Sequence, residues 1–303
     1  MNIVYSSDEN YVQHMGVSML SLFKSNQDAP QLDVYIIAND ISAESRSKLE
    51  QLAQPYHRTL HWIDFTPFRN SLTLNMEWPI SISSYARLFL PKMLPDSCQR
   101  VLYLDCDTVI CDSLQSLWQT DMQGYSVAAV MDLIAPSFKN KIGLMDDDIY
   151  VNAGLLLIDI QRWRDTQILD KFLSYITDCR GRVTHHDQGV INHTLNGQIY
   201  VLHPRYNAMT PFFTSKYKKL LRFYQLKKYY EQDTLLDATR TPAIIHYTPE
   251  FVGRVWETGC KHPKANLYLE QLSDTCWKGN IKQPKALPLK IRLLYWVYKK
   301  QLY

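Results

Sequence analysis

Two aspartates one residue apart, Asp105 and Asp107, follow an apolar run in the segment VLYLDCDTVI. In an extended chain, side chains two positions apart point the same way, so both carboxylates can face one cation. Mg²⁺ and Mn²⁺ favour carboxylate oxygens and keep coordination positions open for substrate phosphates, and Mn²⁺ also accepts an imidazole. The pair is therefore a candidate metal site. A strand-end turn with two solvated acids is the alternative.

The same segment also fits the first motif of haloacid dehalogenase-like phosphatases, in which the first aspartate is a nucleophile and the second an acid and base. Those enzymes usually begin close to this motif and supply a second acidic pair later in the chain. Here about a hundred residues of ordered pattern precede the motif, and the later acidic cluster MDDDIY lacks the expected setting. A metal-dependent phosphatase stays an alternative.

The segments around the aspartates alternate between strand and helix patterns. Apolar runs typical of buried strands occur at residues 1–7, 32–40, 59–65, 100–110, 125–132 and 151–160. Helical spacing of apolar residues occurs at residues 11–25, 42–54, 83–95, 161–176 and 187–195. This alternation predicts a doubly wound α/β domain with a mostly parallel sheet and helices on both faces. In such sheets ligands bind beyond the carboxyl ends of the strands, which is where Asp105 and Asp107 are expected.

The composition is that of a soluble globular protein, with 46% hydrophobic and 21% charged residues among 303. We expect one large domain with a tail. The chain has no run of about 18 uncharged apolar residues, and its first residues lack the pattern of a signal peptide, so we expect a cytoplasmic protein. The six cysteines show no CxxC pairing, which favours reduced thiols over zinc or disulfides.

Charge is distributed unevenly along the chain. The net charge is +3, yet seven basic residues follow the last acidic one, Asp274, and leave the rest of the chain net acidic. These are Lys278, Lys282, Lys285, Lys290, Arg292, Lys299 and Lys300. An acidic body excludes a general attraction to polyanions, and we interpret the basic and aromatic segment 216–230 as a solvated helix face rather than a nucleic-acid site.

The basic tail also carries apolar residues that fall on one helical face. They are Ile291, Leu294, Tyr295, Tyr298 and Leu302. Such a helix is typical of one that lies on an anionic membrane surface, and a simple packing tail is the alternative. We therefore divide the chain into a domain over residues 1–262 and a C-terminal extension over residues 263–303.

Six sequence blocks occur in the order found in family 8 of the retaining glycosyltransferases, and together the blocks make residues 1–262 resemble that family. They are DENY, SSYARL, VLYLDCDTV, VNAGLLLIDIQRW, HDQGVIN and IIHYTPEFVGRVW. The family has the GT-A fold and includes bacterial lipooligosaccharide galactosyltransferases and glycogenin. The resemblance implies transfer of a hexose, galactose or glucose, from a UDP-sugar to a saccharide or glycolipid acceptor, with the envelope or surface glycan as product.

The resemblance also implies a donor site. Asp105, Asp107 and His246 match the family's Mn²⁺ ligands, with Mg²⁺ also compatible, and the cation would offset the charge of the departing UDP. Asp8, Asn10 and Tyr11 match its uridine site. Without the resemblance, Asp8 would be interpreted as a helix cap, Tyr11 as a packing residue, and His246 as a core histidine.

Further positions match residues around the transferred sugar. They are Arg87, Asn152, Gly154, Asp187 and Gln188. Each has an ordinary alternative: Arg87 as a surface cation, Asn152 as a turn residue, Asp187 as a helix cap. We assign Asp187 and Gln188 to the chemical step, and favour attack by the acceptor on the face that UDP leaves over a double displacement. A catalytically silent sugar-binding protein is a further alternative.

Two positions depart from the family's pattern. Arg254 occupies the position of the lysine that contacts the diphosphate in the family. His246 and Trp256 are also separated by two more residues than in many relatives. The guanidinium of Arg254 suits phosphate oxygens, so Arg254 remains a candidate donor-binding residue. Gly189 stands where many relatives have a second acid after the Asp-Gln pair, which weakens any mechanism that requires an acid there.

Overall fold

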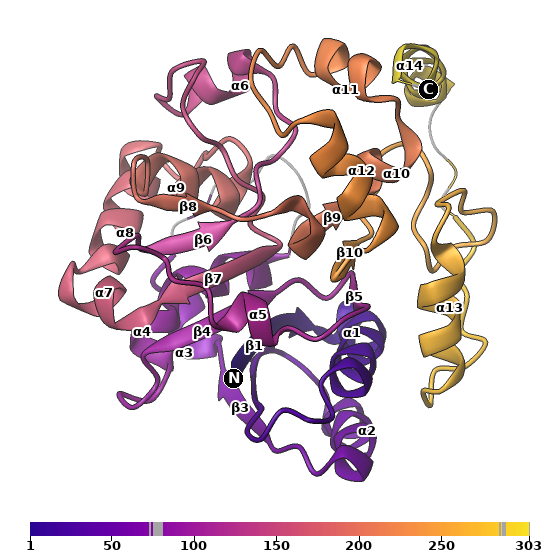
Figure 1. The fold of residues 1–303 in the computed structure, drawn as a ribbon. Coiled ribbons are helices and arrows are strands. Elements are labelled where there is room, and N and C mark those ends of the chain that lie inside the picture. Colours follow the sequence, from indigo (N-terminus) through magenta and orange to yellow (C-terminus); the bar gives the residue numbers. More distant parts are fainter. Residues whose placement is uncertain (73, 75–80, 285, 287–288, 303) are drawn as a thin grey trace.

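The computed structural model describes residues 1–72, 74, 81–284, 286 and 289–302. Its centre is a seven-stranded sheet in the order β3-β2-β1-β4-β7-β6-β8 (Figure 1). The strands are β1 Asn2–Asp8, β2 Asp33–Asn39, β3 Leu60–Asp64, β4 Arg100–Leu104, β6 Val127–Ala129, β7 Leu155–Asp159 and β8 Ile199–Val201. Only β7 runs antiparallel to its neighbours β4 and β6 among these pairs, so the prediction of a mostly parallel sheet is confirmed.

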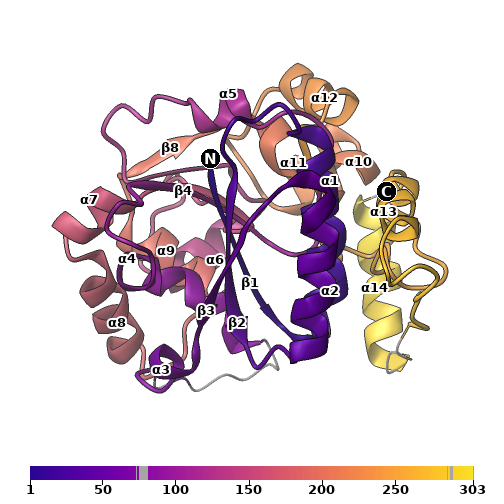
Figure 2. The same cartoon turned by 90° about the horizontal axis from the view of Figure 1, so that it is seen from below.

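Helices cover both faces of the sheet, as Figure 2 shows for β1, β2 and β3. Successive side chains of a strand point to opposite sides of the sheet, so each of these strands contributes residues to both layers. Ile3 and Tyr5 pack with α1 (Val12–Ser25) and α2 (Ala43–Ala53). Val4 packs into the other layer, with Trp163 and Phe172. The strands therefore read as continuous apolar runs because they are buried on both sides.

The remaining helices are mostly short. They are α3 Thr66–Arg69, α4 Leu90–Met93, α5 Gln115–Trp118, α6 Pro136–Lys141, α7 Ile160–Asp165, α8 Ile168–Asp178, α9 His186–Thr194, α10 Thr210–Thr214, α11 Tyr217–Phe223, α12 Gln232–Arg240, α13 Ala265–Ser273 and α14 Leu289–Leu302. The helix predicted over 161–176 is two helices, because Gln167 adopts a left-handed conformation at φ 51°. The helix predicted over 83–95 is mainly a 3₁₀ segment, Ile82–Phe89.

The predicted strand over 100–110 is two strands that belong to different sheets. After β4 the chain turns at Asp105 to Asp107 and continues as β5, Thr108–Ile110. The second sheet has the order β5-β10-β9, with β9 Ala208–Met209 and β10 Ile244–His246. Its register pairs His246 with Thr108. The second sheet therefore brings a histidine from far along the chain to the aspartate turn.

The segment after residue 262 packs on the body of the protein. Tyr268 and Leu272 of α13 are buried in a cluster with Val17 of α1, and the Tyr268 hydroxyl lies 2.7 Å from His14 Nδ1. Further on, Asn280 Nδ2 donates to Gln13 Oε1 at 2.6 Å. Within the described residues, no helix is long and apolar enough to cross a membrane.

Helix α14 lies beside α11 and does not present the face predicted from sequence. The Tyr295 ring meets Phe251 edge-on at 5.1 Å, and the Tyr298 ring meets Phe223 at 5.7 Å, so both tyrosines face the body. Trp296 is the more exposed aromatic of the helix, at 56%. The two tyrosines thus make contacts of the kind that the packing-tail alternative predicts, and association with a membrane stays a prediction. The side chains of Ile291 and Leu302 lie outside the described residues.

Candidate active site

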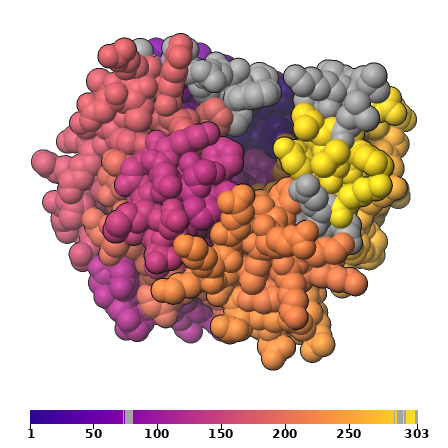
Figure 3. Space-filling view, turned by 90° about the horizontal axis from the view of Figure 1, so that it is seen from above, coloured from indigo at the N-terminus to yellow at the C-terminus, as the bar shows by residue number. Residues whose placement is uncertain are grey.

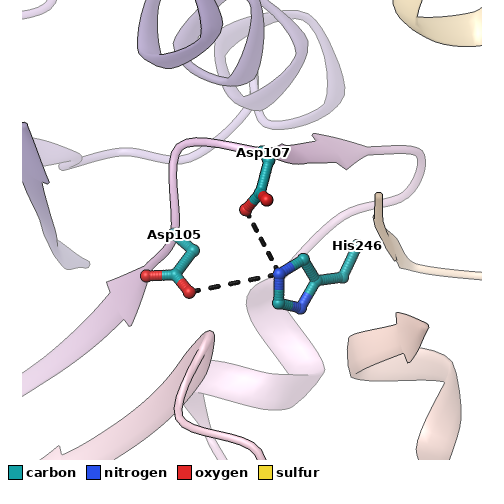
Figure 4. Close-up of side chains that lie close together, drawn as sticks. All are labelled: Asp105, Asp107 and His246. Carbon is teal, nitrogen blue, oxygen red and sulfur yellow. Dashed lines mark ion pairs between the residues drawn. The ribbon is translucent and has the colours of Figure 1, made fainter. Parts of the chain in front are cut away.

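Three side chains that could hold a cation meet where β4 ends. His246 Nε2 lies 3.2 Å from an oxygen of Asp107 and 4.0 Å from an oxygen of Asp105 (Figure 4). One ligand atom from each of the three residues falls within 4.8 Å of the others. Two carboxylates and one imidazole fit a divalent cation of the Mg²⁺ or Mn²⁺ kind, and Mn²⁺ is the one that tolerates nitrogen.

A chain of hydrogen bonds fixes the tautomer of His246. The Gly154 backbone N–H can only donate, and it donates to Asn152 Oδ1 at 2.9 Å. The same oxygen accepts from Asn207 Nδ2 at 2.9 Å, which leaves Asn207 Oδ1 to face His246 Nδ1 at 3.0 Å. Nδ1 therefore carries a proton, and Nε2 faces the aspartates, where it can offer its lone pair to a cation once its own proton has left. A metal-ligating imidazole needs this arrangement.

Gly154 also makes room for this histidine. A Cβ at Gly154 would lie 2.3 Å from His246 Cε1 and 2.9 Å from Asn152 Oδ1. Its backbone carbonyl accepts a hydrogen bond from the Asp105 N–H at 2.8 Å, which ties the start of β7 to the aspartate turn. Glycine at this position is thus a requirement of the site's geometry.

The charge state of the aspartate turn suits a cation. Burial disfavours an ionised Asp107, but His246 and Arg254 outweigh this effect and lower the pKa of Asp107. Burial likewise opposes a charge on His246, but Asp107 and Asp105 raise its pKa overall. Since metal ligands must be deprotonated, the ionised carboxylate is ready to bind, whereas a cation would displace the proton from His246.

Arg87 links the aspartate turn to α9. The arginine is buried, and its guanidinium reaches Asp105 at 2.8 Å, Asp187 at 3.0 Å and the carbonyl of Ala153. Burial disfavours the charge of Arg87, yet the two carboxylates outweigh it and raise the pKa of Arg87. Burial raises the pKa of Asp187. The interpretation of Arg87 as a surface cation is therefore wrong: it orders two acidic side chains.

Gln188 forms hydrogen bonds with three groups. One of them belongs to Asp132, a residue that the sequence analysis missed. Oε1 of Gln188 accepts from the Ala153 N–H at 3.0 Å, and its Nε2 donates to Asp132 at 2.8 Å and to the Tyr150 hydroxyl at 3.3 Å. Asp132 also accepts from Asn152 Nδ2 at 3.3 Å. The sequence held a signal for this residue, because Asp132 closes the predicted strand 125–132 at its carboxyl end, and Asp105 likewise directly follows an apolar run.

Two neighbouring cavities share Ser84, Arg87 and Asp105 in their walls. The larger, of about 820 Å³, contains Asp132, Gly154, Asp187 and Gln188 in its lining. The smaller, of about 350 Å³, contains Asp8, Tyr11, Asp107 and Arg254. Most of the sequence-predicted residues thus line one of these two neighbouring cavities, whereas Asn10, Asn152 and His246 line neither. Asn152 is buried and hydrogen-bonds with Gly154, Asn207 and Asp132.

The three residues predicted to bind uridine differ in their position relative to the smaller cavity. The Asp8 side chain accepts from the Asn10 N–H at 2.9 Å, as a helix cap would, and from the Ser81 hydroxyl at 2.6 Å. Tyr11 is half-buried, and its ring lies edge-on to Trp256 at 5.9 Å. The side chain of Asn10 is exposed and does not line the smaller cavity.

Arg254 lies at the rim of the same cavity. Its guanidinium is 3.3 Å from the second oxygen of Asp107 and lies over the Trp256 ring at 5.2 Å. The positively charged guanidinium of Arg254 can therefore contact both the aspartate turn and an anion bound in the smaller cavity.

Gly189 has no space for a side chain. A Cβ there would lie 1.9 Å from the backbone oxygen of Thr184, because α9 begins immediately beside that carbonyl. The position therefore cannot supply an acid, and the carboxylates at the larger cavity come from other positions, including Asp105, Asp132 and Asp187.

Comparison with known proteins agrees with this geometry. The model of the glycosyl transferase family 8 matches residues 2–253. The chain belongs to glycosyltransferase family 8. The match includes every predicted site residue except Arg254, which lies one position beyond it. The predicted family and the GT-A fold are thereby confirmed.

The family 8 chain is similar to bacterial proteins over most of its length. General stress protein A of Bacillus subtilis is 28% identical, with 91% of this chain and 94% of that protein covered. Lipopolysaccharide 1,2-glucosyltransferase of Escherichia coli K12 is 29% identical, covering 92% of this chain and 80% of that protein. The galactosyltransferase LgtC, solved with donor and acceptor sugar analogs, has a TM-score of 0.75 at 26% identity, with 96% and 99% covered.

Proposed function

We propose that this family 8 enzyme transfers a hexose from a UDP-sugar to a saccharide acceptor with retention of anomeric configuration, and that it requires a divalent cation. The observation that carries the proposal is the Asp105, Asp107 and His246 group, in which Asp105 lines both cavities and Asp107 lines the smaller one. The smaller cavity suits the nucleotide and the larger one the two sugars. The family supports this assignment over a phosphatase or a silent sugar-binding protein.

The residues divide by the part of the donor that they would contact. Asp8 and Tyr11 would hold the uridine and Arg254 the diphosphate, whereas Asn10, the third residue predicted for the uridine, lies outside the lining of the smaller cavity. Asp105, Asp107 and His246 would hold the cation, which when bound offsets the negative charge that develops on the diphosphate as UDP leaves. Arg87, Asn152 and Gly154 would shape the sugar subsite, with Arg87 keeping Asp105 and Asp187 in place.

Transfer exchanges one bond for another at the anomeric carbon. The bond from this carbon to the UDP oxygen breaks, the bond to the acceptor hydroxyl oxygen forms, and the hydroxyl proton passes to the departing phosphate oxygen. Asp187 and Gln188 would act where positive charge develops on the sugar, through electrostatic positioning rather than by covalent attack. The tight pairing of Asp187 with Arg87 supports a fixed rather than a nucleophilic carboxylate.

Galactose and glucose are the donor sugars that we propose. The relatives named above include one glucosyltransferase and one galactosyltransferase, and the former acts on lipopolysaccharide by its name. We therefore propose a glycolipid or another envelope saccharide as acceptor.

We also propose that the enzyme works in the cytoplasm at the inner face of the membrane. Arg292, Trp296 and Lys300 share one side of α14, and the Lys300 amine lies over the Trp296 ring at 3.9 Å. Cations next to an exposed tryptophan are typical of an interfacial helix on anionic lipid.

A panel of UDP-sugars tests the proposed function. Each sugar is incubated with the enzyme and Mn²⁺, with or without chelator, and UDP release is measured. We expect release from UDP-galactose or UDP-glucose only when the cation is present. Release of phosphate from p-nitrophenyl phosphate, lost in Asp105→Asn, would instead support the phosphatase.

A further inference from the structure

The larger cavity is built from segments that lie far apart in the chain. Gly154, Asp187 and Gln188 line one part of it, whereas Phe138, Phe223 and Tyr298 also contribute to its wall. Tyr298 belongs to α14, at the extreme end of the chain. Figure 3 shows the hollow on this face of the molecule, bordered by the yellow atoms of the tail helix.

Tyr298 is held in this wall by other aromatic rings. Its ring meets Phe223 of the α11 helix edge-on at 5.7 Å and lies 5.9 Å from Phe251, which in turn meets Tyr295 edge-on at 5.1 Å. Edge-to-face contacts of this kind fix ring orientation and leave part of each ring open. Tyr298 remains 40% exposed, so a ligand in the cavity can reach it.

The chemistry of this wall suits a sugar. A pyranose has an apolar C–H face that lies against aromatic rings and a rim of hydroxyls that need polar partners. The cavity offers both, with aromatic rings beside Asp132, Asp187 and Gln188. Its volume of about 820 Å³ is near the upper end of the roughly 300–1,000 Å³ typical of small-molecule sites. It therefore has room for more than the one sugar that is transferred.

We propose that α14 forms the outer wall of the acceptor subsite and that the Tyr298 ring contacts the acceptor saccharide. The assignment rests on the proposed glycosyl transfer and adds a recognition role to a helix otherwise assigned to membrane binding. The two roles use different sides of the helix, because Tyr295 and Tyr298 face the body whereas Arg292, Trp296 and Lys300 lie on another side.

Steady-state kinetics in solution, without lipid or detergent, test the subsite. Lactose, maltose and cellobiose serve as probe acceptors with UDP-galactose or UDP-glucose, and UDP release without acceptor is measured in parallel. We expect Tyr298→Ala to raise the acceptor KM about three- to tenfold, the range that loss of one aromatic contact gives. The same variant should leave the donor KM and acceptor-free UDP release unchanged. Tyr298→Phe keeps the ring and should behave as the native enzyme.

Tyr125→Ala is the matched control. Tyr125 is similarly exposed, at 37%, and its ring contacts Tyr200, away from both cavities. An unchanged acceptor KM in Tyr298→Ala would overturn the subsite while the transferase assignment stands. Equal losses of acceptor-free UDP release and transfer would assign Tyr298 to folding instead. Native enzyme that hydrolyses the donor but uses none of the three probes would also contradict the subsite, whereas absence of donor hydrolysis would contradict the proposed function.

Discussion

His246 Nδ1 lies 3.0 Å from Asn207 Oδ1, and this contact decides which nitrogen of the imidazole faces Asp105 and Asp107. Asn207 itself is fully buried and is oriented by Asn152, whose own orientation follows from a backbone N–H. The geometry of the candidate metal site is therefore set by residues that would touch neither cation nor substrate.

Substitution of Asn207 should weaken cation-dependent UDP binding. Asn207→Leu removes the acceptor for the Nδ1 proton, and loss of such an outer partner typically lowers metal affinity about 10- to 100-fold. Asn207→Asp keeps the acceptor but loses the donor to Asn152, so the affinity should fall less than in Asn207→Leu. Calorimetry with Mn²⁺ or chelator measures the binding, and nitrogen NMR of the metal-free protein reports the tautomer. Equal losses in the two variants, with a native tautomer in both, would contradict this role.

Asp107→Asn should reduce turnover by more than about a hundredfold, since one carboxylate ligand and the partner of Arg254 are lost together. The fold should survive with a loss of about 1–2 kcal/mol, because the neutral amide still fills the space. UDP release and thermal unfolding measure the two effects. Asp112→Asn is the control, since Asp112 pairs with Arg205 at 2.7 Å outside both cavities. Turnover close to the native rate in Asp107→Asn would rule out the metal site.

Asp187→Asn and Gln188→Ala should lower kcat and leave the donor KM little changed, because we assign both residues to the charge that develops in the transition state. Asp178→Asn, an exposed position on α8, is the matched control and should behave as the native enzyme. Initial rates over a range of UDP-sugar concentrations separate the two constants. A raised KM with a native kcat would reduce Asp187 and Gln188 to ordinary binding residues.

The stability of the protein should fall as the pH decreases from about 6.5 towards 3. Burial lowers the pKa of His14 to about 3, from a usual value of 6.5. The unfolded chain therefore takes up a proton in this window while the folded one does not, and the free energy of unfolding decreases by roughly 2 kcal/mol between pH 6.5 and 5. Denaturant unfolding of His14→Gln should lose this part of the slope. His57→Asn, at an exposed histidine, should keep it.

Neutralising the outer side of α14 should release the enzyme from anionic vesicles. Each Lys or Arg near such a surface contributes about 1 kcal/mol, so Arg292→Gln, Lys299→Gln and Lys300→Gln together should lower binding by about two orders of magnitude. Flotation with anionic and neutral vesicles measures it, and UDP-sugar hydrolysis should be unchanged. Substitution is a better test than truncation before Lys278, which would also remove the Asn280 contact with Gln13. Equal flotation of native and variant protein would contradict membrane binding.

The sequence predicted those parts of the site that follow from strand patterns and motif order. Asp105 and Asp107 do lie beyond the carboxyl end of a buried strand, and His246 does meet them. Local pattern could not reveal that β4 and β5 enter different sheets, because both halves of the run are equally apolar and the division depends on β10. It could not reveal Asn207 either, since its role depends on contacts with residues 55 and 39 positions away.

Because β5 pairs with β10, the site can form during synthesis only after β10 has been made. Asp107 directly precedes β5, and Thr108 of this strand has its partner 138 residues later, at His246. At about 5–20 residues per second, a ribosome needs roughly 7 to 28 s to cover that distance. A nascent chain that has not reached residue 246 lacks both this neighbouring strand and His246, the third member of the candidate metal site. The protein therefore becomes competent to transfer sugar only in about the last fifth of its translation.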